Sequence, residues 1–376
     1  MRILYWTSAY WPFIGGMETH AAHLVRALHA RGHDIIVVTS HGVLDLPDLD
    51  EHDGVVIHRF PFHEAIEKRD PLLFLHTQKA LTSLKQQFRP DVVHVNPSDA
   101  AVIFHVRTAS AYPAKVCVSL HIPLQPENCD AHSLVGTLLR SADSITTVSH
   151  YQRAKLQRYV PEVASITSVI ENGTAIPDCA PTALPVDPPR LLCVGRLVRG
   201  KGIDVAIEAF ALVRNRWPAA RLLIAGDGPE RQMLESLAGS LGADDGVEFL
   251  GWVRPDRVHH VINESSMVLV PSRWDESFPL VALEAAHMGR PVIASRAGGL
   301  PEIVVHGKTG ILVEREQPVS LAHAIETLLG QPALAAQYGA AARERALSQF
   351  TVSRCVDDYE KVYRQLKRET AHAGAE

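Results

Sequence analysis

Two carboxylates at a fixed spacing are the side chains of this sequence most suited to chemistry. Glu276 and Glu284 enclose seven residues in the segment SRWDESFPLVALE. Pro279 suits the first position of a helix, with Ser277 or Phe278 just before it. We therefore expect Glu276 in a loop and Glu284 in the second turn of a helix. Glu284 belongs to an otherwise apolar helix face, where an unpaired carboxylate would be costly, so a binding role explains it better than a solvated surface position does.

The start of this helix predicts an anion site between the two carboxylates. The apolar run MVLVP before the motif is typical of a buried parallel strand, so the motif follows the carboxyl end of a strand. The backbone N–H groups near Leu280 and Val281 have no acceptor inside the helix and can bind an anion. Two carboxylates beside an anion site suit a ligand with hydroxyls on either side of a phosphate. A nucleotide sugar is such a ligand.

A basic glycine loop, GRLVRGKG, begins at residue 195 after another apolar run. It nearly matches the phosphate loop G-x4-G-K-[ST], but Gly202 has no hydroxyl to hold Mg²⁺. A phosphate site of this kind must neutralise charge with cations, and Arg196 and Lys201 are suited to a diphosphate. Gly226 lies in the turn AGDGP and Val253 in the segment GWV, both after strand-like runs. Such turns are common in α/β folds and are weak signals alone.

The amino-terminal half offers two further candidates. Gly15 and Gly16 lie in a loop between a strand and a helix, where their N–H groups can face a ligand. His121 ends the apolar run KVCVSLH, at the carboxyl edge of a strand. A tight turn and a structural histidine are the simpler alternatives for these residues.

Taken in order, these motifs resemble the retaining glycosyltransferases of family 4. The resemblance rests on GG, His121, the NG turn at residues 172–173, GR…KG, GDGP and E-x7-E, and it runs from Gly15 to Glu302. It implies the GT-B fold, in which two Rossmann-like doubly wound α/β domains face each other across a cleft. It also implies transfer of a sugar from a nucleoside diphosphate to an acceptor hydroxyl, with retention, without a metal and by a front-face mechanism.

The resemblance assigns roles residue by residue. Glu276 contacts the hydroxyls of the donor sugar, Glu284 holds the ribose, Arg196 and Lys201 hold the diphosphate, and His121 contacts the donor sugar. The predicted catalytic residues are His121, Arg196, Lys201 and Glu276; the predicted donor-binding residues are Gly15, Gly16, Gly226, Val253, Phe278, Pro279, Leu280, Val281 and Glu284. No metal ligand and no cofactor are expected, and the donor is expected to be of the UDP or GDP type.

Two other functions remain open from the sequence. A nucleotide-sugar epimerase with the same fold would bind a similar donor but need no acceptor, and it should lack E-x7-E in this form. A non-catalytic nucleotide-sugar sensor should have lost Arg196, Lys201 or a motif glutamate. All of these residues are present.

Length and pattern predict two domains. The 376 residues suit two domains of about 150–200 residues each. Strand and helix patterns alternate twice, on either side of the proline-rich segment PDCAPTALPVDPP. We expect an amino-terminal, acceptor-side domain over residues 1–178, a linker over 179–189, a nucleotide-sugar-binding domain over 190–352, and a helical tail over 353–376 that can cross back to the first domain.

Composition limits the partners. A net charge of −5 and an isoelectric point near 6.5 argue against a general nucleic-acid binder. No run approaches the ~18 apolar residues of a membrane span, the amino terminus does not read as a signal peptide, and five scattered cysteines suit reduced thiols. Asp48-Leu-Asp50 lies in what we expect to be a polar loop. We expect a cytoplasmic enzyme whose acceptor is a small molecule, a glycan or a lipid-linked sugar, with peripheral membrane contact left open.

Overall fold

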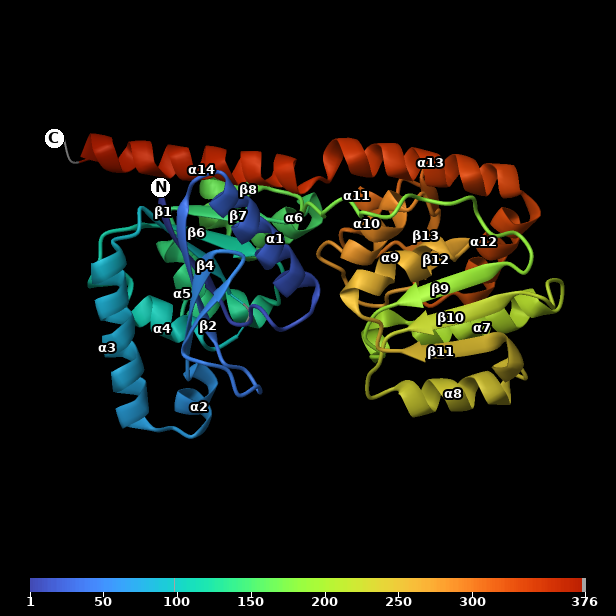
Figure 1. The fold of residues 1–376 in the computed structure, drawn as a ribbon, viewed down its shortest axis with the longest axis horizontal. Helices are drawn as coiled ribbons and strands as arrows, with labels where there is room; N and C mark the ends of the chain where they lie inside the picture. The colour runs from blue at the N-terminus through green and yellow to red at the C-terminus, as the bar shows by residue number, and fades with distance from the viewer. Residues whose placement is uncertain (98, 374–376) are drawn as a thin grey trace. The chain divides into compact units, whose positions relative to one another are not determined.

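A computed structural model describes residues 1–97 and 99–373 of the chain. The chain forms two compact α/β units. Unit 1 comprises Met1–Gly173 and Val352–Glu376, and unit 2 comprises Thr174–Thr351. Figure 1 shows that the last helix, α14 (Val352–Ala373), lies along the strands and helices of unit 1. The chain thus leaves unit 1 once and returns to it for its final helix.

Unit 1 is built on an eight-stranded sheet in the order β3-β4-β2-β1-β5-β6-β7-β8. Every pair is parallel except β3 with β4 at one edge. The strands are β1 Arg2–Thr7, β2 Asp34–Ser40, β3 Leu49–His52, β4 Val55–Phe60, β5 Val92–Asn96, β6 Lys115–Leu120, β7 Ser144–Thr147 and β8 Thr167–Val169; the helices are α1 Gly16–Ala30, α2 Phe62–Glu67, α3 Pro71–Phe88, α4 Val102–Arg107, α5 Leu134–Ser141, α6 His150–Tyr159 and α14.

Alternation along the central strands gives unit 1 a core on each face of the sheet. Leu4 and Trp6 of β1 belong to the core that α2, α3, α4 and α5 cover. Ile3 and Tyr5, on the opposite face, pack with residues of α1 and α14. The final helix is therefore part of the core of unit 1.

Unit 2 contains a six-stranded parallel sheet in the order β11-β10-β9-β12-β13-β14. Its elements are β9 Arg190–Val194, α7 Ile203–Arg214, β10 Arg221–Ala225, α8 Arg231–Ser240, β11 Val247–Gly251, α9 Pro255–Asn263, β12 Met267–Val270, α10 Leu280–His287, β13 Val292–Ser295, α11 Leu300–Ile303, β14 Gly310–Val313, α12 Pro318–Gly330 and α13 Pro332–Gln349. Along the chain, β10 and β11 are added on one side of β9, and β12, β13 and β14 are added on its other side, so the strand order reverses between β9 and β12. Ligands of doubly wound sheets bind at the carboxyl ends of the strands at such a switch point.

The proline-rich segment that we expected to link the domains packs on unit 2. The N–H group of Thr182 donates to Asn263 Oδ1 over 2.9 Å, and the buried guanidinium of Arg290 donates to the Thr182 carbonyl over 2.8 Å. Ser266 Oγ donates to the Pro185 carbonyl over 2.5 Å. These contacts place residues 179–189 within unit 2, and the division between the units falls at Gly173 and Thr174.

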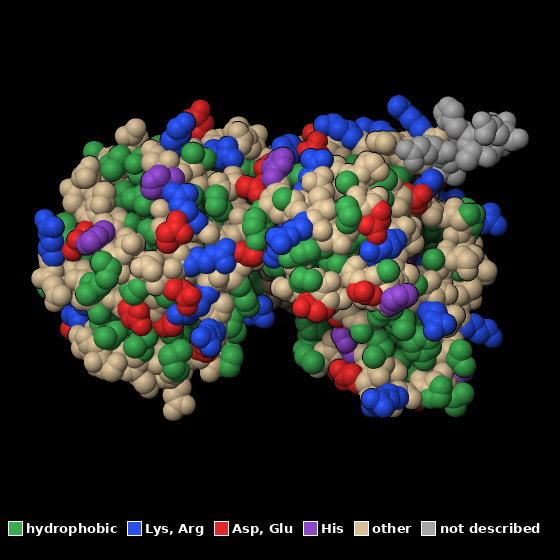
Figure 2. Space-filling model, turned by 180° about the vertical axis from the view of Figure 1, so that it is seen from behind, with side chains coloured by type: hydrophobic (Ala, Val, Ile, Leu, Met, Phe, Trp, Pro, Cys, Tyr) green, Lys and Arg blue, Asp and Glu red, His purple; other side chains and the backbone are tan. Residues whose placement is uncertain are grey.

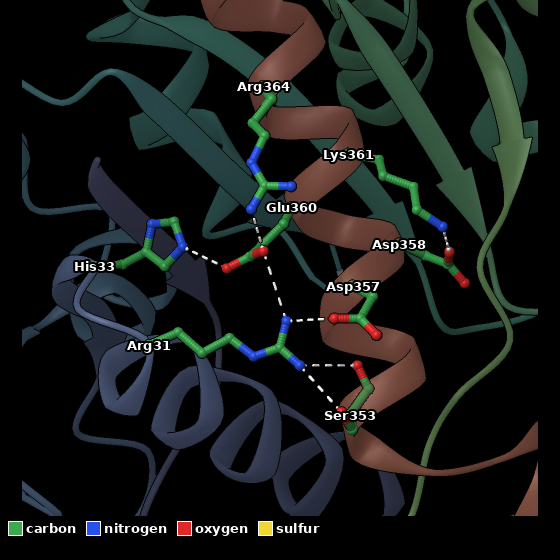
Figure 3. Close-up of polar contacts among 8 residues, drawn as sticks. All are labelled: Arg31, His33, Ser353, Asp357, Asp358, Glu360, Lys361 and Arg364. Carbon is green, nitrogen blue, oxygen red and sulfur yellow. Dashed lines mark hydrogen bonds and ion pairs between the residues drawn. The ribbon is translucent and has the colours of Figure 1, made fainter.

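Charged side chains fix α14 to the short connection between α1 and β2, as Figure 3 shows. Arg31 Nη1 donates to Asp357 Oδ1 over 2.5 Å, and His33 Nε2 lies 2.9 Å from Glu360 Oε1. On the buried side of the helix, the hydroxyl of Tyr363 lies 2.5 Å from His94 Nδ1. The tail is thus held by ion pairs at its margin and by a tyrosine in the core.

The expectation of a polar loop around Asp48-Leu-Asp50 was wrong. Leu49–His52 forms the antiparallel edge strand β3, which pairs with β4. The buried guanidinium of Arg59 on β4 stabilises this edge through Asp50 Oδ2, at 2.9 Å. Sequence alternation is weak there because an edge strand presents polar residues on both sides.

On the face shown in Figure 2, basic and acidic side chains are interspersed, with no extended patch of one sign. Among the described residues, no helix combines the length and apolar character needed to cross a membrane.

Candidate functional site

Glu276 lies at the switch point of unit 2, in the loop between β12 and α10. Its side chain is only 11% exposed. One oxygen, Oε1, accepts hydrogen bonds from Lys201 Nζ at 2.7 Å, from Ser272 Oγ at 2.7 Å and from Trp274 Nε1 at 3.0 Å. Three donors on one oxygen fix the carboxylate in place.

This arrangement brings together two of the predicted catalytic residues, Lys201 and Glu276. Ser272 and Trp274 also lie in the segment SRWDESFPLVALE, but no motif assigns them a role. The available signal was their spacing, because side chains four and two residues before Glu276 can reach back to it within a tight loop.

Close packing of the β9 and β12 loops depends on Gly200. A Cβ atom there would lie 2.1 Å from the ring of Trp274, and the Gly200 carbonyl accepts from the Arg273 N–H group over 2.8 Å. Lys201, in the short 3-10 turn Arg199–Lys201, lies with its ammonium 5.7 Å from the centroid of the Trp274 ring. The ammonium thus contacts both an aromatic face and a carboxylate.

The β13 loop supports the Glu276 backbone through Gly298 and Gly299. A Cβ atom on Gly298, whose φ is +59°, would lie 2.1 Å from the Glu276 carbonyl oxygen. The same oxygen accepts from the Gly299 N–H group over 2.7 Å. This glycine pair therefore packs directly against the loop that carries Glu276.

Helix α10 follows this loop and carries Glu284. It begins at Leu280 with Pro279 as N-cap, and it ends at His287 with Met288 as C-cap. Phe278 is buried, and Val281 lies in the first turn. Glu284 is half-buried, and desolvation raises the pKa of its carboxyl to about 7. This carboxyl therefore titrates near neutral pH in the absence of a ligand.

The other predicted residues of unit 2 occupy neighbouring loops. Arg196 is exposed, directly after β9. Gly226, after β10, donates from its N–H group to the Gly251 carbonyl over 2.7 Å, and half-buried Val253 follows β11. All three lie beyond the carboxyl ends of their strands, on the same edge of the sheet as Glu276.

Unit 1 holds Gly15, Gly16 and His121. Gly15 is the N-cap of α1, which follows β1, and His121 follows β6; only β5 separates these two strands in the sheet. Both ring nitrogens of His121 are buried without a partner among the described residues. Burial, and then nearby His94, lower the pKa of His121 to about 3, so its imidazole is neutral.

The structure adds His20, which sequence analysis did not select. Its ring lies 5.0 Å from that of His121, centroid to centroid, and burial lowers its pKa well below the usual value, with His121 as the next cause. The signal was its position on α1, one turn after Gly15 and Gly16. Two neutral imidazoles can each donate one hydrogen bond and accept one, which suits hydroxyl groups better than phosphate.

Family models match both units. The model of Glycosyltransferase Family 4 matches residues 14–176, and that of Glycosyl transferases group 1 matches residues 178–345. Glycogen synthase of Mycobacterium tuberculosis (strain ATCC 25618 / H37Rv) is 30% identical over 403 residues, which cover 98% of this chain and 95% of that protein.

Solved structures show the same architecture. Sucrose-phosphate synthase from Thermosynechococcus elongatus matches with a TM-score of 0.83 and 25% identity, over 97% of this chain and 98% of that one. HepE from Anabaena, in complex with UDP and glucose, matches with a TM-score of 0.78 and 21% identity, over 97% of this chain and 100% of that one.

The two Rossmann-like units and these matches identify the protein as a glycosyltransferase with the GT-B fold. More narrowly, the chain belongs to glycosyltransferase family 4.

Proposed function

We propose that the protein transfers a sugar from a nucleoside diphosphate sugar to an acceptor hydroxyl, with retention of the anomeric configuration and without a metal ion. The observation that carries this proposal is Glu276, a nearly buried carboxylate held by three donors at the switch point of unit 2. One of these donors is Lys201, from the basic glycine loop. The carboxylate that binds the donor sugar and the ammonium that binds the phosphates are therefore already in contact in this proposal.

The diphosphate is bound by cations and by helix N–H groups in this proposal. Arg196 supplies a planar guanidinium at the surface, and Lys201 supplies a point charge. The first N–H groups of α10, at Leu280 and Val281, add the positive end of the helix. These groups supply the charge neutralisation that a divalent cation would otherwise provide.

The two motif glutamates bind hydroxyls on either side of the phosphates. Glu284, in the second turn of α10, accepts from the ribose. Glu276 accepts from the donor sugar through Oε2, because Oε1 is already occupied by its three donors. His121, neutral and with no partner among the described residues, contacts a hydroxyl of the same sugar.

Retention follows from a front-face departure in this scheme. The leaving diphosphate, stabilised by Arg196 and Lys201, takes the proton of the acceptor hydroxyl as the new bond forms on the face that the diphosphate leaves. The protein contributes positioning and electrostatic stabilisation and forms no covalent intermediate.

We further propose a hexosyl or N-acetylhexosaminyl donor of the UDP or GDP type. The similar glycogen synthase and the HepE complex with UDP and glucose support this class. The acceptor is a small molecule, a glycan or a lipid-linked sugar. Five free cysteines, four of them buried, support a reducing compartment such as the cytoplasm.

Slow donor hydrolysis in chelator tests the proposal. UDP- and GDP-linked hexoses and N-acetylhexosamines are incubated with the protein in EDTA, and release of nucleoside diphosphate is measured. We expect release from at least one donor, loss of release in Glu276→Gln, and no loss in Glu248→Gln, which changes an exposed acid on β11. Activity that requires Mg²⁺ or Mn²⁺ would reject the cation-neutralised mechanism, and release from no donor would reject the function.

The anomeric proton of the product tests retention. Once an acceptor is found, an α-linked donor should give an α-linked product by NMR. A β-linked product would contradict the front-face scheme and the role given to the diphosphate in it.

A further inference from the structure

The chain passes between the two units at two places, Gly173–Thr174 and Thr351–Val352. Inside unit 2 these places are adjacent. Thr174 forms a parallel β-bridge with Thr351, and its N–H group donates to the Phe350 carbonyl over 3.0 Å. We call residues 171–176 and 349–354 the crossing segments. The two crossing segments are therefore joined by backbone hydrogen bonding.

The carboxyl end of α10 binds the first crossing segment. His287 is fully buried at the last position of the helix, and its Nε2 lies 2.8 Å from Thr174 Oγ1. The guanidinium of Arg343 donates to the His287 carbonyl, which fixes the end of the helix from the other side. The helix that carries Glu284 therefore ends on Thr174.

The loop before α10 contacts the second crossing segment. Phe278, two residues after Glu276, is 5% exposed, and its ring meets the ring of Phe350 edge to face, with centroids 5.6 Å apart at 69°. Arg345 lies 5.1 Å over the same Phe350 ring and donates to the Glu302 carbonyl over 2.8 Å. The stretch from Glu276 to His287 thus touches a crossing segment near each of its ends, through Phe278 and through His287.

We propose that His287 and Phe278 are positioning residues that transmit occupancy of the donor site to the crossing segments. This inference rests on the proposed function. The eight residues of α10 span about 12 Å, so a donor that pulls on Leu280 or Glu284 also shifts His287 at the other end of the helix. Phe278 lies in the loop directly before the helix, two residues after Glu276, and shifts with a donor that pulls on Glu276. The hydrogen bond and the ring contact pass that shift to Thr174 and Phe350. A donor that binds one conformation better then changes the population of crossing-segment conformations.

Substitutions on the far side of each contact test the link without changing the donor motif. Thr174→Val removes the hydroxyl but keeps its shape, and Phe350→Leu removes the aromatic edge. We expect each to lower kcat about fivefold and to leave the dissociation constant of the nucleoside diphosphate within about twofold. Phe210→Leu, in the core under α7, is the matched packing control, for which we expect an unchanged kcat.

A double-mutant cycle separates the bond from its residues. If the His287–Thr174 hydrogen bond carries the effect, His287→Phe should lower kcat little further in the Thr174→Val background than Thr174→Val does alone. Multiplying effects would show that the two residues act independently and would contradict a link through this bond.

Hydrogen exchange gives a direct readout. UDP and GDP are added in turn, and amide exchange is followed by mass spectrometry in peptides that cover the crossing segments. We expect the nucleotide that binds to slow exchange there in the parent and in Phe210→Leu, and this protection to disappear in Thr174→Val and Phe350→Leu although they still bind the nucleotide. Protection that persists in both variants would overturn the inference and leave the proposed function standing. A parent that binds neither nucleotide and hydrolyses no donor would remove the proposed function, and the inference with it.

Discussion

Replacing Glu284 with glutamine should raise the free energy of unfolding at neutral pH. In the acid range the variant should be at least as stable as the parent. Burial raises the pKa of this carboxyl from an ordinary value of 4.5 to about 7 in the folded protein. Between pH 4.5 and 7 the folded protein therefore holds a proton that the unfolded chain has lost. The free energy of unfolding of the parent falls as the pH rises through this window and is constant with respect to this group above it. Glutamine carries no charge and does not incur this loss.

The size of the effect follows from the same pKa. A rise from 4.5 to about 7 corresponds to about 3 kcal/mol at most, and partial solvent access to Glu284 reduces it. We expect Glu284→Gln to exceed the parent by about 1–3 kcal/mol at pH 8 and to equal it near pH 4.5. Urea unfolding at pH 4.5, 6, 7 and 8 measures this difference. Glu248→Gln, which changes an exposed acid on β11, is measured alongside as the control substitution. A Glu284→Gln difference that is constant, or that grows toward pH 4.5, would refute the desolvation argument.

The same carboxyl links nucleotide binding to protons. Ribose hydroxyls donate to the ionised form, so binding of a nucleoside diphosphate should lower the pKa of Glu284 and release protons between about pH 5 and 7. Affinity should rise with pH up to about 7 and then level off. Calorimetry in buffers of different ionisation enthalpy should show a buffer-dependent binding enthalpy in the parent and a smaller dependence in Glu284→Gln. Equal dependence in both proteins would remove the ribose role.

Four other substitutions probe the remaining assignments. Arg196→Ala and Lys201→Ala should each weaken nucleoside diphosphate binding by about 1.5–3 kcal/mol, and Lys201→Ala should also leave Glu276 with two donors; calorimetry that shows unchanged affinity in both would contradict the phosphate site. His121→Ala should slow transfer about 100-fold and keep the product anomer, as NMR of the product would show; a transfer rate equal to that of the parent would exclude the contact with the sugar. Glu360→Gln should destabilise unit 1 by about 1–3 kcal/mol, because this nearly buried acid binds His33 and Arg364, and unchanged urea unfolding would show that these contacts do not hold α14.

The order of motifs along the sequence predicted the fold class, and the structure and the comparisons confirm it. Runs such as ILYW and LLCV are apolar throughout, so they specify strands buried on both faces without any knowledge of their neighbours. Local patterns of this kind fail at the edges. The segment that forms β3 is polar, and its pairing with β4 is supported by Arg59 of that next strand, which binds Asp50. The proline-rich segment has the sequence of a linker, yet it packs on unit 2. Its local sequence could not predict this, because its partners Asn263 and Arg290 lie far along the chain.

The candidate site could be predicted as a set of residues but not as an arrangement. Lys201 and Glu276 are 75 residues apart, and their contact depends on β9 lying beside β12, an order that no single strand encodes. The structure also shows why residue 200 is a glycine, since any side chain there would collide with Trp274. His287 presents the same problem more sharply. Its spacing from Glu284 places the two on one side of α10, yet nothing in the helix indicates that its imidazole meets Thr174, 113 residues earlier. Residues that support a site, such as Gly200 and His287, and residues that are expected to bind its ligand, such as Lys201 and Glu276, are therefore under different constraints. Sequence motifs identify mainly the ligand-binding residues.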